Sequence, residues 1–332
     1  MARFLVRRIL QGIFVMFMVT LIIFGLFFIG PGPAYIARRL GGREATPQTL
    51  ALITHRLRLD KPLYKQYWYF VWEAPGKGGS KIEGLLHGSL GLSYIHQQPV
   101  TSVLKQAVPV TLSLALGASI IWLVVGVLSG VLSAVRRGSL SDRVVTIIAL
   151  ICYSTPVFVI GLLLLFVFYF KLTKAGIHFF PGQGYTYLTD NPVKWFEGLI
   201  LPWIALAMIS AAVYTRLTRG SMLDVMGEDY IRTARAKGLS ERRVIYRHAL
   251  RAALTPVASQ FGVDVGALLG GAILTETVFG LPGLGYTAVT SIQNQDLPVI
   301  MGVVVVASAA VVVANIVVDA FYAVLDPRVR LH

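Results

Sequence analysis

The amino-acid sequence predicts an all-α integral membrane protein with six transmembrane helices. Hydrophobic residues make up 55% of its 332 residues and charged residues only 14%, whereas about a quarter of the residues of a soluble domain are charged. Six apolar stretches are long enough to cross the hydrocarbon core of a bilayer, which takes roughly 20 helical residues. Lys and Arg, which give the chain a formal net charge of +14, gather in some of the connections between these stretches, a pattern that sets membrane topology.

The predicted spans are residues 9–30, 110–135, 144–170, 198–214, 256–280 and 298–324. The first follows Arg3, Arg7 and Arg8, as the apolar part of a secretory signal would, but it is too long for one and no small-x-small cleavage site follows it. We therefore expect a retained N-terminal transmembrane helix within residues 1–30. In the third span, Pro156 removes a backbone hydrogen bond and is expected to kink the helix.

Positive charges in the short loops predict the orientation of the spans. With the N-terminus in the cytoplasm, nine Lys and Arg lie in the inner loop 215–255, whereas only three lie in the short outer loops. Cytoplasmic loops carry such an excess, so both termini are predicted to be cytoplasmic in a multi-pass protein of the inner or plasma membrane. Residues 31–106 are then an extracytoplasmic region, residues 107–323 the main transmembrane domain and residues 324–332 a cytoplasmic tail.

The extracytoplasmic region has predicted structure of its own. Thr46 and Pro47 have the residue types of a helix N-cap and of a first helical position. Pro62 is expected to open a second helix that continues through Val71. The glycine-rich segment 76–80 is a predicted break after that helix.

One basic stretch lies between two apolar ones, and residues 228–257 read EDYIRTARAKGLSERRVIYRHALRAALTPV. Its spacing predicts a helix, a turn at Gly238 in the left-handed conformation, and a second helix capped by Ser240. An ion pair between Glu228 and Arg232 is expected to support the first helix. The second helix is expected to present one apolar-leaning face, made of Val244, Ile245, His248 and Ala252.

Three functions are considered for a short basic helix-turn-helix of this kind. A DNA-binding element is disfavoured because both ends of the stretch are tied to the bilayer. An amphipathic helix that rests on anionic lipid explains the charge but not the small residues Ala234, Ala236 and Gly238. A docking site for a cytoplasmic protein explains both features, because small residues let a protein groove approach the backbone closely.

The stretch resembles the cytoplasmic coupling motif of ATP-binding-cassette (ABC) importer permeases, whose general form is Glu-Ala-Ala, three residues, Gly, nine residues and Ile-x-Leu-Pro. Ala234, Gly238 and Leu250 match that form. Four positions depart from it. Arg232 stands in place of Glu and Thr233 in place of the first Ala, and His248 stands in place of Ile and Arg251 in place of Pro.

The chain is more closely similar to the dipeptide/oligopeptide/nickel branch of these permeases. The similar segments are DYIRTARAKGLSERR, LDKPLYKQY, GSLGLSY, VTLSLAL, RRGSLSDR, TETVFGLPGLG and DAFYAVLDPRVR. Residues 73–83 match the branch poorly, as an insertion would. The resemblance implies a type I ABC importer permease fold, with the permease domain over residues 107–323.

The resemblance also implies partners. These are a second homologous permease subunit, two ATP-binding-cassette ATPase subunits, an extracytoplasmic substrate-binding protein and membrane lipid, with no nucleic acid. Closure of the ATPase dimer on ATP would move the coupling helices and alternate the access of the pathway. The implied ATPase-coupling residues are Asp229, Tyr230, Arg232, Ala234, Arg235, Ala236, Lys237, Gly238, His248 and Leu250.

The chain carries no motif of an enzyme. The phosphate-loop pattern G-x-x-x-x-G-K-[ST] does not occur, so we expect a transport subunit without a cofactor or metal of its own, and ATP and Mg in the partner subunits. A stand-alone secondary transporter, the competing class, would require denser charge inside the membrane. Peptides are the default cargo of the resembled branch. Nickel is less expected because no His or Cys cluster lines the spans, and glutathione is a further alternative.

Two carboxylates of the fifth span are candidates for the transport pathway. Asp264 lies at about mid-depth and Glu276 near the outer end. A charge at the bilayer centre is costly, so Asp264 is expected either to line the pathway or to bind a neighbouring helix. For Glu276, and for Asp319 in the sixth span, the structural role is favoured. Close helix packing is expected at two pairs of glycines, Gly126 with Gly130 and Gly266 with Gly270.

Overall fold

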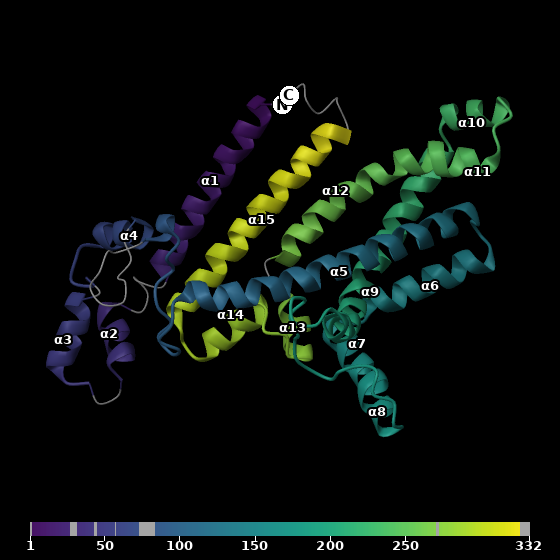
Figure 1. The fold of residues 1–332 in the computed structure, drawn as a ribbon. Coiled ribbons are helices and arrows are strands. Elements are labelled where there is room, and N and C mark those ends of the chain that lie inside the picture. Colours follow the sequence, from purple (N-terminus) through teal and green to yellow (C-terminus); the bar gives the residue numbers. More distant parts are fainter. Residues whose placement is uncertain are drawn as a thin grey trace. The chain divides into compact units, whose positions relative to one another are not determined.

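The computed structural model describes residues 2–26, 32–42, 45–56, 58–72, 84–269 and 272–325. Within these ranges every regular element is a helix, apart from one isolated antiparallel bridge between Leu92 and Pro99 (Figure 1). Among the described residues, five helices are long and apolar enough to cross a membrane, and a sixth span results if one bent helix pair counts as a single span. The predicted all-α class is confirmed. The chain forms two compact units, Met1–Pro109 with Pro282–Ile316, and Val110–Leu281 with Val317–His332.

The first unit is built on two long helices, α1 (Ala2–Phe24) and most of α15 (Leu297–Leu325). Ile23 of α1 packs with Met301 and Val305 of α15. The helices approach closely at Gly12, where an added Cβ would lie 2.7 Å from a methyl group of Val312. The unit also holds the start of α5 (Val100–Val135) and the shorter helices α2 (Pro33–Gly41), α3 (Pro47–Arg56), α4 (Leu63–Trp72), η3 (Leu85–His87) and α14 (Leu284–Gln293).

The two helices predicted between the first two spans are confirmed. The Thr46 hydroxyl accepts a hydrogen bond from the Thr49 amide at 3.3 Å, and α3 begins at Pro47. α4 begins directly after Pro62. The predicted insertion at 73–83 lies outside the described residues, as does the end of the predicted tail, residues 326–332.

A buried carboxylate fastens the GSLGLSY segment to α15. Asp296 is 2% exposed and precedes the first residue of α15. It accepts hydrogen bonds from the Ser93 hydroxyl and, at 3.0 Å, from the Tyr94 amide. A buried charge needs such partners, so this contact holds the segment in place within the first unit.

The second unit packs the rest of α5 against α9 (Pro192–Met226), as predicted from the glycines. An added Cβ at Gly126 would lie 2.4 Å from the Tyr214 Cβ, and one at Gly130 would lie 2.6 Å from the Thr218 Cβ. Only glycine permits this approach of the two helices. Of the other predicted pair, Gly266 is buried in α12 (Leu250–Leu269) and Gly270 lies outside the described residues.

Two helices extend well beyond their predicted spans. α5 has 36 residues and α9 has 35, whereas the apolar stretches 110–135 and 198–214 are shorter. Hydropathy detects only the segment that matches the hydrocarbon core, and polar residues at its ends continue the helix without leaving an apolar signal. α9 therefore covers residues 215–226 of the predicted cytoplasmic loop and ends at Met226.

Two other spans are broken rather than continuous. The predicted span 144–170 divides at Pro156 into α6 (Leu140–Ser154) and α7 (Val157–Leu164), and the latter continues as the π-helix η4 (Leu165–Lys171) and α8 (Leu172–Lys174). The expected kink is thus a complete break, and only Val157–Lys174 is long enough to cross by itself. The predicted span 256–280 divides between α12 and α13 (Ile273–Phe279). The axes of these two helices make an angle of 56°.

Candidate coupling surface

α10 (Asp229–Ala236) is held by one buried face. It follows α9 after a break at Gly227 and Glu228. Ile231 is fully buried and Ala234 is 8% exposed. Burial of a side chain such as Ile231 contributes roughly 1.5–3 kcal/mol. Both residues belong to one cluster with the ends of α5, α9 and the helix that leads into α12, formed by Val131, Ala134, Met222, Val244, Ile245, Ala249 and Ala253.

The other faces of α10 and the following turn are charged and exposed. The Asp229 side chain is 95% exposed and that of Arg232 is 73% exposed. Ala234 was expected to leave the backbone open, but it belongs to the buried face, because it lies one helical turn after Ile231. His248 and Leu250 are half-buried. The exposed members of the predicted coupling set are Asp229, Tyr230, Arg232, Arg235, Ala236, Lys237 and Gly238.

The turn after α10 has the predicted left-handed glycine. Gly238 has φ +77°, and an added Cβ would meet nothing within 4 Å, so the backbone angle rather than space requires glycine there. An ion pair closes the turn, since the Arg235 guanidinium donates to both carboxylate oxygens of Glu241, at 2.8 and 3.2 Å. This pair lowers the pKa of Glu241 below its ordinary value. The predicted pair of Glu228 with Arg232 is wrong, because Arg232 pairs with Asp229 at 3.4 Å.

The second helix of the predicted motif is not a separate short helix, because it runs without a break into the helix of the fifth span. α11 (Glu241–Arg243), the π-helix η5 (Val244–Ala249) and α12 follow one another without a break. Ser240 occupies the N-cap position without a side-chain cap bond. A π-helix has a wider turn than an α-helix, which moves the buried face from the predicted His248 and Ala252 to Ala249 and Ala253.

A carboxylate at the start of α6 ties that helix to α9. Asp142 is 5% exposed. It accepts two hydrogen bonds from the Arg219 guanidinium, at 2.9 and 3.0 Å, one from the Gly138 amide at 2.9 Å, and one from the Ser133 hydroxyl. Arg219 holds the pKa of Asp142 well below its usual range. In the sequence, Asp142 stood out only as part of the segment RRGSLSDR. Its partner Arg219 could not be predicted, because it lies 77 residues away.

Asp264 contacts polar groups, as expected for a carboxylate in a span. It accepts hydrogen bonds from the Tyr214 hydroxyl of α9 and from the Gln260 amide of its own helix, both at 2.9 Å. Donors of this kind satisfy the hydrogen-bonding capacity of a carboxyl group inside a span. The side chain is half-buried. The Tyr214 hydroxyl was not anticipated, since a tyrosine in an apolar helix gives no sign of where it points.

Glu276 is fully buried in α13 and accepts a hydrogen bond from the Thr111 hydroxyl of α5 at 2.8 Å. This contact joins two helices of the second unit. The side chain of Asp319 lies outside the described part of α15. In the described ranges, no group of three or more His, Cys, Asp or Glu gathers as metal ligands would.

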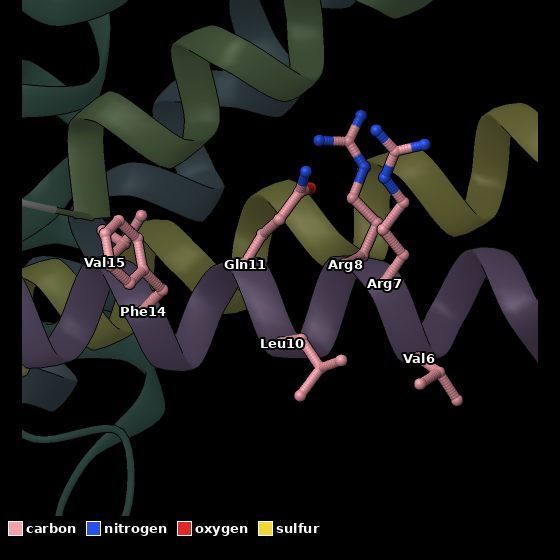
Figure 2. A pocket seen from close by; sticks show the side chains of 7 residues that line it. All are labelled: Val6, Arg7, Arg8, Leu10, Gln11, Phe14 and Val15. Atoms are coloured by element: carbon pink, nitrogen blue, oxygen red, sulfur yellow. The ribbon is translucent and has the colours of Figure 1, made fainter.

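An open recess runs beside α1 (Figure 2). Its lining comes from α1 alone and consists of Val6, Arg7, Arg8, Leu10, Gln11, Phe14 and Val15. Arg7, Arg8 and Gln11 point to one side of the helix, and Val6 and Leu10 point to the other (Figure 2). Because the lining is mostly apolar and lies on α1, of which Val6–Phe24 is apolar enough to cross a membrane, we assign no ligand to it.

Comparison with known proteins shows the family. Residues 126–331 match the family described as "Binding-protein-dependent transport system inner membrane component", and residues 1–115 match the N-terminal family of such membrane components. The chain belongs to this family. It is therefore a multi-pass inner-membrane permease of a binding-protein-dependent ABC importer and a non-catalytic component of that system.

Relatives with curated names cover almost the whole permease. A probable peptide ABC transporter permease of Sinorhizobium fredii is 38% identical over 99% of this chain and 100% of its own length. The di/tripeptide permease DppB of Pseudomonas aeruginosa is 39% identical, and the dipeptide permease DppB of Escherichia coli is 37% identical, each over 99% of both chains. An inward-facing structure of the MetNI methionine ABC transporter matches 68% of this chain and 97% of its own with a TM-score of 0.54 and 18% identity, a likeness of fold.

Proposed function

We propose that this permease pairs with a second homologous permease to form the pathway for uptake of di- and oligopeptides. A substrate-binding protein would deliver the peptide, and two ATPase subunits that bind ATP and Mg would drive the cycle. The support for the cargo is that three relatives, aligned over 99% of this chain at 37–39% identity, are named for peptide transport. No observation favours nickel or glutathione.

We infer that α10 and the turn at Gly238 are the contact for an ATPase subunit, on the cytoplasmic side with both termini. The charged face of α10 is exposed, as a docking surface must be. Its buried face is packed on the ends of α5, α9 and the helix that continues into α12. A force on α10 would therefore reach three helices at once.

The pathway itself is proposed to run along the polar residues of α12. Thr255 is exposed, and Ser259, Gln260 and Asp264 are half-exposed. Thr255 and Ser259 are four residues apart, as are Gln260 and Asp264, so each pair lies on one side of the helix. Lipid disfavours such polar groups inside the membrane. A water-filled pathway or the second permease would accommodate them, and Asp264 adds a carboxyl group.

The cargo is tested with the permease pair, both ATPases and the binding protein reconstituted in vesicles. Uptake driven by ATP is measured for a labelled dipeptide, a labelled pentapeptide, nickel and glutathione. The proposal requires peptide uptake that depends on both ATP and the binding protein. Uptake of nickel or glutathione without uptake of either peptide would contradict the cargo and leave the importer class intact.

The role of Asp264 is tested with Asp264→Asn in the same vesicles. We expect the complex to assemble as in the wild type and peptide uptake to fall severalfold. Tyr214→Phe is the matched control, because it removes one hydrogen bond to Asp264 and keeps the charge. If both variants chiefly lower the yield of assembled complex, Asp264 binds helices together; if Asp264→Asn transports normally, it does not act in the pathway.

A further inference from the structure

α4 has two different faces, and one of them packs against α1. Gln66 is buried, and its amide donates to the carbonyls of Leu59 and Lys61, at 3.2 and 2.7 Å. The Tyr67 hydroxyl lies 3.0 Å from the Thr20 hydroxyl of α1. Phe70 packs on the apolar cluster that joins α1 to α15. These contacts fix the rotation of α4 about its own axis.

The contacts of Tyr67 give the depth of α4 along α1. Its ring packs edge-on against Phe17, with 6.3 Å between centroids, and against Phe24, with 5.3 Å. Phe24 ends the α1 segment that is apolar enough to span a membrane, Val6–Phe24. At 1.5 Å per residue, Phe17 and Phe24 are separated by about 10 Å of helix. α4 therefore lies along the last turns of α1, in the outer half of the predicted span 9–30 and toward the headgroups of that leaflet.

The opposite face of α4 is aromatic and exposed. Tyr64, Trp68 and Trp72 follow at intervals of four residues, so they share one side of the helix. They are 71%, 57% and 44% exposed. The Trp68 and Trp72 rings stack, with an angle of 13° between planes and 5.7 Å between centroids. Lys65 is exposed next to Tyr64.

We propose that α4 is an interfacial membrane-binding helix, whose Tyr64–Trp68–Trp72 face lies among lipid headgroups in the leaflet at the Phe24 end of α1. Two observations favour lipid over a protein partner. The inner contacts place α4 against the outer half of the first span, so the outer face lies toward the bilayer surface. Its residue types are those that concentrate there, because Trp and Tyr join an apolar ring to a polar atom, and Lys65 can reach a phosphate.

The test uses the full chain in its assembled complex, in nanodiscs of phosphatidylethanolamine and phosphatidylglycerol. A fraction of the lipid carries bromine, a contact quencher of tryptophan, either near the headgroup or near the chain end. Tryptophan emission is compared between the wild type and Trp68→Phe/Trp72→Phe. We expect bromine near the headgroup to quench a larger fraction of the emission of the wild type than of the double variant. The emission that Trp68 and Trp72 contribute should be quenched more by bromine near the headgroup than by bromine near the chain end.

The matched control is Trp195→Phe, which removes a half-buried tryptophan of α9. It should retain the headgroup-proximal quenching of the wild type. Phenylalanine at positions 68 and 72 keeps an aromatic ring at exposed sites, so the double variant should fold. Equal quenching of the wild type and the double variant would overturn the proposal. The proposal would also be overturned if the two tryptophans were shielded from aqueous acrylamide only when the substrate-binding protein is added. That result would assign the face to the binding protein.

Discussion

α4 and α10 are short helices of ten and eight residues, each held by one buried face against the ends of predicted spans. α4 is held by Gln66, Tyr67 and Phe70, and α10 by Ile231 and Ala234. Their free faces differ in kind. That of α4 is a row of aromatic rings, whereas that of α10 carries Asp229, Arg232 and Arg235. The buried face thus decides where such a helix lies, and the chemistry of its free face indicates what it meets.

The contrast between α4 and α10 requires that the two helices lie on opposite sides of the membrane. One predicted span precedes α4 and four precede α10. Single cysteines at Lys65 and Lys237, in a Cys152→Ala background, should therefore react with an impermeant reagent from opposite sides, Lys65 from outside and Lys237 only after the membrane is permeabilised. Both side chains are exposed in the structure. Labelling of both from outside would refute the six-span orientation.

Among single substitutions, the largest loss of stability and of peptide uptake is expected at the buried face of α10. Ile231→Ala removes a fully buried side chain and should destabilise the attachment of α10 by about 2–5 kcal/mol. Peptide uptake should fall severely while ATP hydrolysis loses its dependence on substrate. Ile231→Val, which keeps most of the side chain, should cost about 0.5–1.5 kcal/mol and retain most uptake. Wild-type coupling in Ile231→Ala would show that α10 transmits no force.

The turn at Gly238 should show a smaller effect of different origin. Gly238→Val meets no atom within 4 Å, but its positive φ costs a branched residue about 1–2 kcal/mol, which lowers the population of the native turn by about 5- to 30-fold. Uptake should fall accordingly. Gly176→Val is the matched control, because Gly176 has φ +84° and equally open surroundings outside the coupling surface. Equal loss of uptake in both variants would attribute the effect to folding.

The smallest effect is expected from the ion pair of the turn. Arg235→Glu places two like charges across the turn, and an exposed pair contributes about 0–1 kcal/mol, so docking of the ATPase should weaken only a fewfold in a binding assay. Because Arg235 and Glu241 form a two-bond contact, the exchanged pair Arg235→Glu/Glu241→Arg should restore most of the docking. Failure of the exchange would mean that Arg235 acts through a charge on the ATPase rather than through the turn.

Several features were predicted from local sequence because a local rule governs them. The left-handed turn at Gly238, the N-cap at Thr46 and the helix after Pro62 each depend on a few neighbouring residues. Close packing at Gly126 followed from the absence of a side chain. The errors lie where contacts with neighbouring helices determine which residues are buried. Ala234 was assigned to the exposed side, and the buried face after Val244 was placed one residue too early, because regular helical spacing was assumed across a π-helix.

By itself, the sequence determined the all-α membrane class, the left-handed turn at Gly238 and the lack of a phosphate loop. Apolar length, turn chemistry and motif spacing are properties of the chain alone. Only the tertiary structure decided which charges are partnered. Asp142 with Arg219, Asp264 with Tyr214 and Asp296 with Ser93 join residues 50 to 203 positions apart. A carboxylate in an apolar environment requires hydrogen bonds or an opposite charge, but only the packing of the helices determines which distant side chain supplies them.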